Sequence, residues 1–224
     1  MQCTVCDAPP MGVRGLDDGE RAALVLNECQ RGMVDPAVAG NGALAGEVAR
    51  RGVVPRLAEL AQACRDAGVL VVHSTIVPRA DSVGTMRNCL LLASLVKKGV
   101  VVAGAPGAEI HSDLAPQQGD VVIERVHGLT PFHSTELEPV LRSRGVQTVI
   151  VTGVSTNVGV PGACLEAVNR GFTVVVPEDC TAGAWPEAHE FQVTHTLPLL
   201  ATVTTAAAVS EVLGSRRAAA LPAS

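Results

Sequence analysis

The sequence lacks the features that mark nucleic-acid-binding, membrane-spanning and secreted proteins. It has no basic run, and its 17 Lys and Arg against 22 Asp and Glu give a net charge of −5, so an electrostatic footprint for nucleic acid is missing. Its longest apolar stretches, such as residues 90–96, are far shorter than the ~20 residues that span a bilayer. Residues 1–20 contain no basic stretch followed by an apolar one, as a signal peptide would. We therefore expect a soluble cytoplasmic protein that binds neither nucleic acid nor a membrane.

The cysteines do not form a disulfide or metal framework. Their number is seven, and an odd count in such a protein favours reduced thiols. Cys3 and Cys6 form one CxxC pair, but no second pair or histidine cluster completes a zinc site. We predict no metal and no cofactor, and we interpret residues 1–20 as an irregular N-terminal segment.

Short apolar runs rich in β-branched residues alternate with helical patterns along the chain. This alternation implies crossover connections and a parallel sheet that is covered on both faces. At 224 residues the chain suits one domain. We predict an α/β fold, a Rossmann-like three-layer αβα domain over residues 21–213, with a mainly parallel six-stranded sheet and the first strand central. The predicted strands are 22–27, 69–73, 121–125, 148–152, 173–176 and 201–203.

Helical spacing of apolar residues places the helices between these strands. The first predicted helix, 44–67, has a break at Pro55 and ends at Gly68. Residues 75–118 have a weaker pattern with one helix around 88–97, which makes them a candidate lid. The tail, 214–224, has little to bury and is predicted to fray. The remaining predicted helices are 134–144, 160–170, 187–200 and 206–213.

Polar residues and a glycine-containing loop follow three of the predicted strands. Ligands of such sheets bind beyond the carboxyl ends of the strands, so we expect Glu28, the Arg125 region and the loop 154–159 to share one pocket. A partly desolvated Glu28 would have a raised pKa and could exchange a proton near neutral pH. The alternative is an ordinary carboxylate that caps a helix or pairs with Arg125. Gly159 should begin a helix, where backbone N–H groups can stabilise an anion.

Three segments resemble the isochorismatase-like hydrolases, also called the cysteine hydrolase family. Residues 23–30, ALVLNECQ, resemble that family's opening strand, which ends in aspartate, any residue and glutamine. Residues 119–125, followed by 131–137, are similar to its lysine strand and the F-x-x-T-x-L helix start. Residues 153–160, with 171–179 beyond them, resemble its cysteine loop and fifth strand. The resemblance runs from about residue 21 to residue 209.

The resemblance implies a hydrolytic triad of aspartate, lysine and cysteine, and this chain differs at every position. Alignment on the glutamine puts Glu28 at the aspartate, and counting from Gly153 puts Gly159 at the cysteine. Counting forward from Asp120 puts Arg125 at the lysine, whereas counting back from Phe132 puts Val126 there.

Cys164 and Cys29 are the alternative candidates for a nucleophile. Cys164 lies five residues beyond Gly159 on a predicted helix, so it faces elsewhere. Cys29 follows Glu28 directly, and successive strand side chains point to opposite faces. We therefore interpret both thiols as small buried hydrophobic groups.

Without a nucleophile, acid–base chemistry is favoured over amide hydrolysis through a thioester. Hydrolysis of an enol ether, such as the one in isochorismate, needs a proton on carbon and a water molecule, and some members of the isochorismatase branch carry glycine at the cysteine position. We predict a hydrolase of a small polar metabolite that uses Glu28 as a non-covalent general acid. The alternative is a catalytically silent member that acts as a binding or assembly subunit. By resemblance we expect a homodimer or homotetramer.

Seven further residues are expected to contact the substrate. His127 could instead be a hydrogen-bonded structural residue, and Trp185 either walls the pocket or packs under a loop. His73 ends the predicted second strand near the metal ligands of related amidases, but the Asp-x-His spacing is absent. The resemblance also implies a non-proline cis peptide near residues 154 and 155. The expected substrate-contacting residues are His73, His127, Phe132, Val154, Ser155, Val158 and Trp185.

Overall fold

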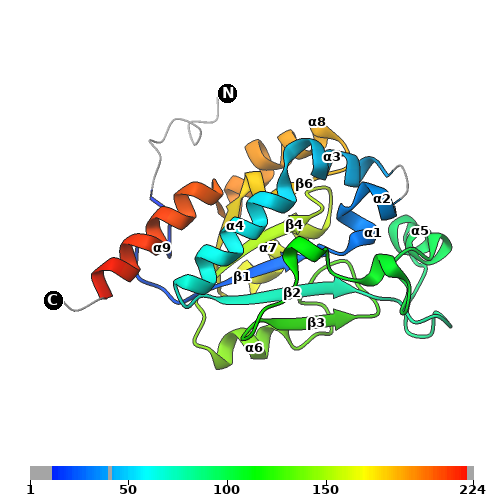
Figure 1. The fold of residues 1–224 in the computed structure, drawn as a ribbon, viewed down its shortest axis with the longest axis horizontal. Coiled ribbons are helices and arrows are strands. Elements are labelled where there is room, and N and C mark those ends of the chain that lie inside the picture. The colour runs from blue at the N-terminus through cyan, green and yellow to red at the C-terminus, as the bar shows by residue number, and fades with distance from the viewer. Residues whose placement is uncertain (1–11, 40–41, 221–224) are drawn as a thin grey trace.

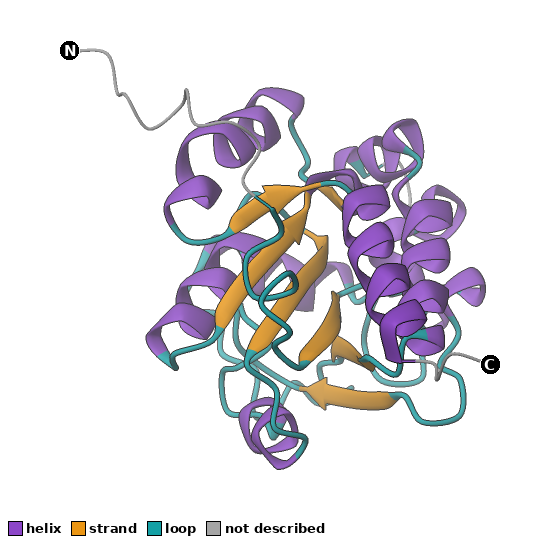
Figure 2. Ribbon diagram, turned by 90° about the vertical axis from the view of Figure 1, so that its left-hand side faces the viewer, coloured by secondary structure: helices purple, strands orange, loops and turns teal. Residues whose placement is uncertain are grey.

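A parallel β-sheet forms the middle layer of the fold, and helices cover both of its faces (Figures 1 and 2). The computed structural model describes residues 12–39 and 42–220. The sheet order is β3-β2-β1-β4-β5-β7, with β6 paired to β4, and every strand pairing is parallel. This confirms the predicted α/β class and the central first strand. The strands are β1 Ala22–Asn27, β2 Leu70–Ile76, β3 Val121–Arg125, β4 Thr148–Val154, β5 Thr173–Pro177, β6 Thr181–Ala182 and β7 Thr202–Thr204.

The core forms two layers because the central strands are buried on both faces. In β1 the side chains of Leu24 and Leu26 belong to one apolar cluster, with residues of α4 and α9. Ala23 and Val25 belong to the other, with residues of α6 and α7. This alternation is the period-2 geometry of a strand, and it explains why all of β1 is buried. The helices are α1 Arg31–Val34, α2 Pro36–Ala39, α3 Ala43–Arg51, α4 Val53–Asp66, α5 Leu90–Lys98, α6 Leu137–Ser143, α7 Gly159–Asn169, α8 Pro186–Phe191 and α9 Ala206–Ala220.

The first long helical segment breaks at a different residue from the predicted one. Gly52 separates α3 from α4 and adopts a left-handed conformation with φ +63°, which glycine tolerates without a steric cost. Pro55 is the third residue of α4, and a proline in the first turn of a helix removes no intrahelical hydrogen bond. The prediction of a break at Pro55 was therefore wrong.

The sheet has a seventh strand that the sequence did not predict. The two residues of β6 pair with Gly153 and Val154 at the end of β4, and two residues are too few to show a periodic pattern. The second strand also continues to Ile76, three residues beyond its predicted end.

The C-terminal segments also differ from the prediction. After α8, residues 192–196 form a π-helix and residues 197–199 a 3-10 helix, where one helix to residue 200 was predicted. Residues 214–220 are helical rather than frayed, because α9 continues to Ala220. Arg216 holds this extension by donating to the backbone carbonyls of Glu20 (3.0 Å) and Gly15 (3.4 Å).

The N-terminal segment is described only in part. Residues 12–20 form turns without a helix or strand, and Val13 and Leu16 are buried in the core. The Cys3–Cys6 pair and residues 221–224 lie outside the described residues. Across residues 12–39 and 42–220, no helix has both the length and the apolar character needed to cross a membrane.

Candidate active site

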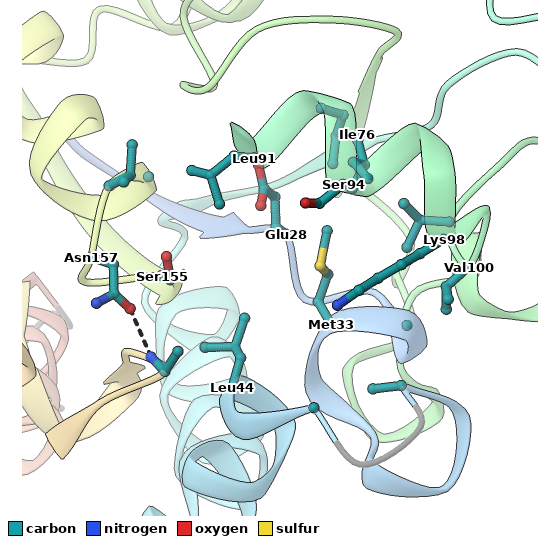
Figure 3. A pocket seen from close by; sticks show the side chains of 18 of the residues that line it. Glu28, Met33, Leu44, Ile76, Leu91, Ser94, Lys98, Val100, Ser155 and Asn157 are labelled. Carbon is teal, nitrogen blue, oxygen red and sulfur yellow. Dashed lines mark hydrogen bonds between the residues drawn. The ribbon is translucent and has the colours of Figure 1, made fainter. Parts of the chain in front are cut away.

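A cavity of about 380 Å³ opens beyond the carboxyl ends of the central strands (Figure 3). Glu28 follows β1, Ile76 ends β2, and residues 155–159 connect β4 to α7. Segments that are far apart in sequence complete the wall, as expected at this edge of a parallel sheet. Most of the lining is apolar, and its polar side chains include Glu28, Ser94, Lys98, Ser155 and Asn157.

Glu28 is held against Arg125 from the neighbouring strands. The backbone N–H of Glu28 donates to the carbonyl of Ser74 at 2.7 Å. Arg125, the last residue of β3, extends past β2 and donates through one guanidinium nitrogen to Glu28 Oε1, while a second nitrogen lies 3.2 Å from Ser74 Oγ. The side chains of Arg125 and Glu28 are 2% and 16% exposed. Glu28 lines the cavity and Arg125 does not, so the arginine contacts the carboxyl group from behind.

Burial and the charge of Arg125 change the pKa of Glu28 in opposite directions. Burial raises the pKa of the Glu28 carboxyl above that of an ordinary glutamate, while the charge of Arg125 and its hydrogen bond lower it. Burial is the larger effect, so the pKa is raised. Glu28 therefore holds a proton at higher pH than an exposed glutamate, and Arg125 stabilises the carboxylate that remains once the proton has left.

Val126 does not compete with Arg125 for this role. Its side chain is 37% exposed, and its carbonyl accepts a hydrogen bond from Thr85 Oγ1 at 2.5 Å. Of the two residues that sequence counting left open, Arg125 is the one that reaches Glu28.

The loop from Val154 to Gly159 forms the wall beside Glu28. The peptide bond between Val154 and Ser155 is cis, which confirms the expectation from the resemblance. The Ser155 carbonyl accepts from the N–H groups of Val158 (3.2 Å) and Val160 (3.0 Å), and α7 begins at Gly159. Ser155, Val158 and Gly159 line the cavity, whereas Val154 is fully buried and does not.

Asn27, for which no role was predicted, occupies the space beside Gly159. Its Nδ2 donates to the Val154 carbonyl at 2.5 Å. A Cβ atom on residue 159 would lie 2.9 Å from Asn27 Nδ2 and 3.2 Å from the Val154 oxygen. The position therefore has no room for a side chain unless Asn27 moves. A polar residue at the last position of an apolar strand was the available signal.

His127 lies beside the cavity rather than in its wall. Its Nδ1 accepts from the backbone N–H of Met86 at 3.3 Å, and its ring meets that of His133 edge-on at 5.8 Å. The next two residues, Gly128 and Leu129, do line the cavity. These contacts agree with the structural alternative for His127.

Phe132 lies in the core, away from the cavity. Its ring packs 6.2 Å from that of Phe172, with the Arg170 guanidinium 5.0 Å above it. It is 5% exposed and belongs to the apolar cluster under α6 and α7.

His73 also lies away from the cavity, because β2 continues three residues beyond it. Its Nε2 is 3.2 Å from an oxygen of Asp120, which forms an ion pair with Arg65 at 2.7 Å. Asp120 precedes β3, so this group lies at the amino end of the strands. Within the described residues, no set of three or more His, Cys, Asp or Glu side chains is placed to hold a metal ion.

Trp185 lines the cavity next to the loop 155–159. It is 61% exposed and precedes α8. The neighbouring Ala184 donates its N–H to Asn157 Oδ1 at 2.7 Å (Figure 3). The rest of the lining includes residues for which no place in the site was predicted: Met33 and Leu44 and, from the candidate lid, Leu91, Leu92, Ser94, Leu95, Lys98, Val100 and Val101.

The two thiols closest to the site in sequence are unsuited to nucleophilic attack. Cys29 and Cys164 are 3% and 0% exposed, and neither lines the cavity. Burial raises the pKa of each thiol to about 12. A thiolate is the reactive form of cysteine, and burial disfavours that form of both thiols.

Comparison with known proteins agrees with this geometry. The sequence model of the isochorismatase domain matches residues 22–208. The chain belongs to the isochorismatase family. Among its relatives in the family, maleamate amidohydrolase from Pseudomonas putida is 28% identical over 178 residues, which are 77% of each chain.

Solved structures of the isochorismatase family have the same fold. A cysteine hydrolase from Pseudomonas syringae pv. phaseolicola matches with a TM-score of 0.78 and 26% identity, over 93% of this chain and 99% of its own. An isochorismatase family protein from Desulfovibrio vulgaris matches with a TM-score of 0.75 and 28% identity, over 87% and 99%. Proteins of this family are hydrolases. The cavity at the carboxyl ends of the strands is therefore the candidate site of a hydrolytic reaction.

Proposed function

We propose that this chain hydrolyses a small polar metabolite by general acid catalysis, with Glu28 as the acid and without a covalent enzyme intermediate. One observation carries the proposal: among the described residues that line the cavity, Glu28 is the acidic one and there is no cysteine. The raised pKa of the buried Glu28 carboxyl supports it. We infer that Glu28, Arg125 and Gly159 stand where the family's aspartate, lysine and cysteine would be.

Enol-ether hydrolysis fits these groups. Glu28 donates its proton to the terminal carbon of the enol ether, which leaves a carboxylate on the protein and an oxocarbenium ion on the substrate. Water adds to the cation and releases a proton, which restores the acid, and the hemiketal then separates into a carbonyl compound and an alcohol. Arg125 stabilises the Glu28 carboxylate between these steps. A positioned acid of this kind contributes about 10²–10⁴-fold to the rate.

Gly159 has a structural part in this proposal. It begins α7 at the cavity wall, where the dipole of the helix favours negative charge. The oxygen that leaves as the alcohol gains negative charge when the hemiketal separates, and it would be stabilised there.

Amide hydrolysis through a thioester is the less favoured reaction. The relative from Pseudomonas putida is named for an amide substrate, maleamate. In this chain the equivalent reaction would need a nucleophile, and residue 159 has no side chain, while Cys29 and Cys164 are buried.

The second candidate function is that of a catalytically silent binding or assembly subunit, which the direct contact between Arg125 and Glu28 favours.

A substrate screen tests the proposal. The parent protein and Glu28→Gln are assayed with isochorismate, with maleamate and with simple amides, because the amide side chain fills the same volume and cannot deliver a proton. We expect turnover of an enol ether that falls by about 10²–10⁴-fold in Glu28→Gln, with the fold retained. Turnover of amides alone, or an unchanged rate in Glu28→Gln, contradicts the proposal. Binding without turnover of any of these compounds supports the silent subunit.

We also propose a cytoplasmic location and a homodimeric or homotetrameric assembly. The five cysteines in the described residues, Cys29, Cys64, Cys89, Cys164 and Cys180, are all free, which supports a reducing compartment. Light scattering measures the assembly, and a monomer would contradict it.

A further inference from the structure

Helix α5 turns polar side chains toward the cavity. Ser94 and Lys98 are four residues apart, so they lie on the same face of the helix, and both line the cavity. Leu90, at the start of the same helix, is 82% exposed. Leu91, Leu92 and Leu95 of the same helix line the cavity as well, so Ser94 and Lys98 are the polar side chains on a mainly apolar face, where they can bind a polar group of a ligand.

Lys98 is a cation without a partner in the described structure. Among the described lining residues, Glu28 and Lys98 are the charged ones, and Glu28 is paired with Arg125. Lys98 makes no ion pair or hydrogen bond with any of residues 12–39 and 42–220. Figure 3 shows its side chain extending from α5 toward Met33. An ammonium group at a mainly apolar wall forms its strongest interaction with an anionic group of the ligand, through a charge-assisted hydrogen bond.

We propose that Lys98 binds a carboxylate of the substrate, and that the substrate is therefore an anion whose apolar body lies between Lys98 and Glu28. The role of Glu28 at the reacting end rests on the proposed function above, whereas the charge preference rests on the cavity alone. A second anionic group beside Glu28 would raise the cost of its ionisation, so the substrate carboxylate belongs at the Lys98 end.

The chain offers a matched control for this proposal. Lys97 and Lys98 are both basic residues in the last turn of α5, so they contribute the same charge to the helix end and to the net charge. Of these two lysines, Lys98 lines the cavity and Lys97 does not. Replacement by methionine keeps the length of the side chain and removes its charge, so Lys97→Met and Lys98→Met differ in whether the lost charge faced the cavity.

Two probes of equal shape separate charge from apolar burial. Benzoate and benzamide differ in charge but have nearly the same size, and both fit a cavity of about 380 Å³. Isothermal titration calorimetry measures their binding to the parent protein, Lys98→Met and Lys97→Met. Fluorescence reports whether the bound probe is in this cavity, because Trp185 is the single tryptophan of the chain and lines the cavity.

We expect the parent and Lys97→Met to bind benzoate alike, and Lys98→Met to bind it about fivefold more weakly or worse, as for the loss of a solvent-accessible ion pair. Benzamide should bind equally to all three. The proposal is overturned if the parent binds benzoate no more tightly than benzamide, if Lys97→Met loses as much affinity as Lys98→Met, or if the parent binds neither probe. A Glu28→Gln protein that keeps both its turnover and its Lys98-dependent preference for benzoate would refute the general acid and leave the carboxylate site standing.

Discussion

The substitution Gly159→Ala should destabilise the protein through contact with Asn27. The added Cβ would lie 2.9 Å from Asn27 Nδ2 and 3.2 Å from the Val154 oxygen, and Asn27 is anchored by its hydrogen bond to that same oxygen. Overpacking of a buried site costs about 1–3 kcal/mol, and displacement of Asn27 sacrifices a hydrogen bond worth about 1 kcal/mol. We expect a loss of about 2 kcal/mol, or a fall in Tm of roughly 4–8 °C for a chain of this length.

A double-mutant cycle separates this contact from the other effects of the substitution. Thermal and urea unfolding are measured for Gly159→Ala, Asn27→Ala and the double variant, with Gly46→Ala as the control. Gly46 lies within α3 and has no atom within 4 Å of the added Cβ, so alanine there should be neutral or stabilising. The double variant should be more stable than the sum of the two single changes predicts, by about 1 kcal/mol or more. Additive effects, or a Gly159→Ala protein as stable as the parent, would refute the reasoning.

Two further predictions concern the chemistry of the site. Alkylation of the folded protein with iodoacetamide should spare Cys29 and Cys164, because burial raises their pKa values to about 12, and it should leave turnover largely intact. Mass spectrometry locates the label. Inactivation that follows labelling of either thiol in the folded protein would contradict the non-covalent mechanism. Arg125→Met removes the cation that lowers the pKa of Glu28, so turnover, which needs the protonated acid, should persist to higher pH than in the parent, while Arg125→Lys keeps the charge and should shift the profile less. The pH dependence of kcat/KM measures this shift, circular dichroism checks the fold of both variants, and an unchanged or downward-shifted profile in Arg125→Met would count against Glu28 as the acid.

The sequence predicted the parts of the fold that depend on local pattern. The bounds of β1 and β3 match the predicted ranges 22–27 and 121–125, because each is an apolar run that ends at polar residues or a turn. The strand β6 was missed because it consists of two residues and is defined by its pairing to β4 rather than by any pattern of its own. The break between α3 and α4 was predicted at Pro55 because a proline inside a helix interrupts it. Since Gly52 ends α3, Pro55 lies in the first turn of α4 instead, where proline is tolerated.

The site was predictable where residues follow a strand directly. Glu28 and the loop 155–159 lie at strand ends and line the cavity. His73 was assigned to the site because the predicted strand stopped there, whereas β2 runs on to Ile76. Lys98 was not found, because its place in the wall depends on how the irregular segment 75–118 folds back over the sheet. Such contacts between segments distant in sequence have no local signature.

The protonation of Glu28 tests the account most directly. Protein labelled with ¹³C at the glutamate side-chain carboxyl is titrated by NMR, and comparison with Glu28→Gln identifies the resonance of Glu28. Burial should outweigh the charge of Arg125, so we predict that this carboxyl loses its proton at a pH clearly above the ordinary glutamate value of about 4.3. A Glu28 that titrates at or below that value is held ionised by Arg125, could not serve as the acid, and would contradict the proposed mechanism.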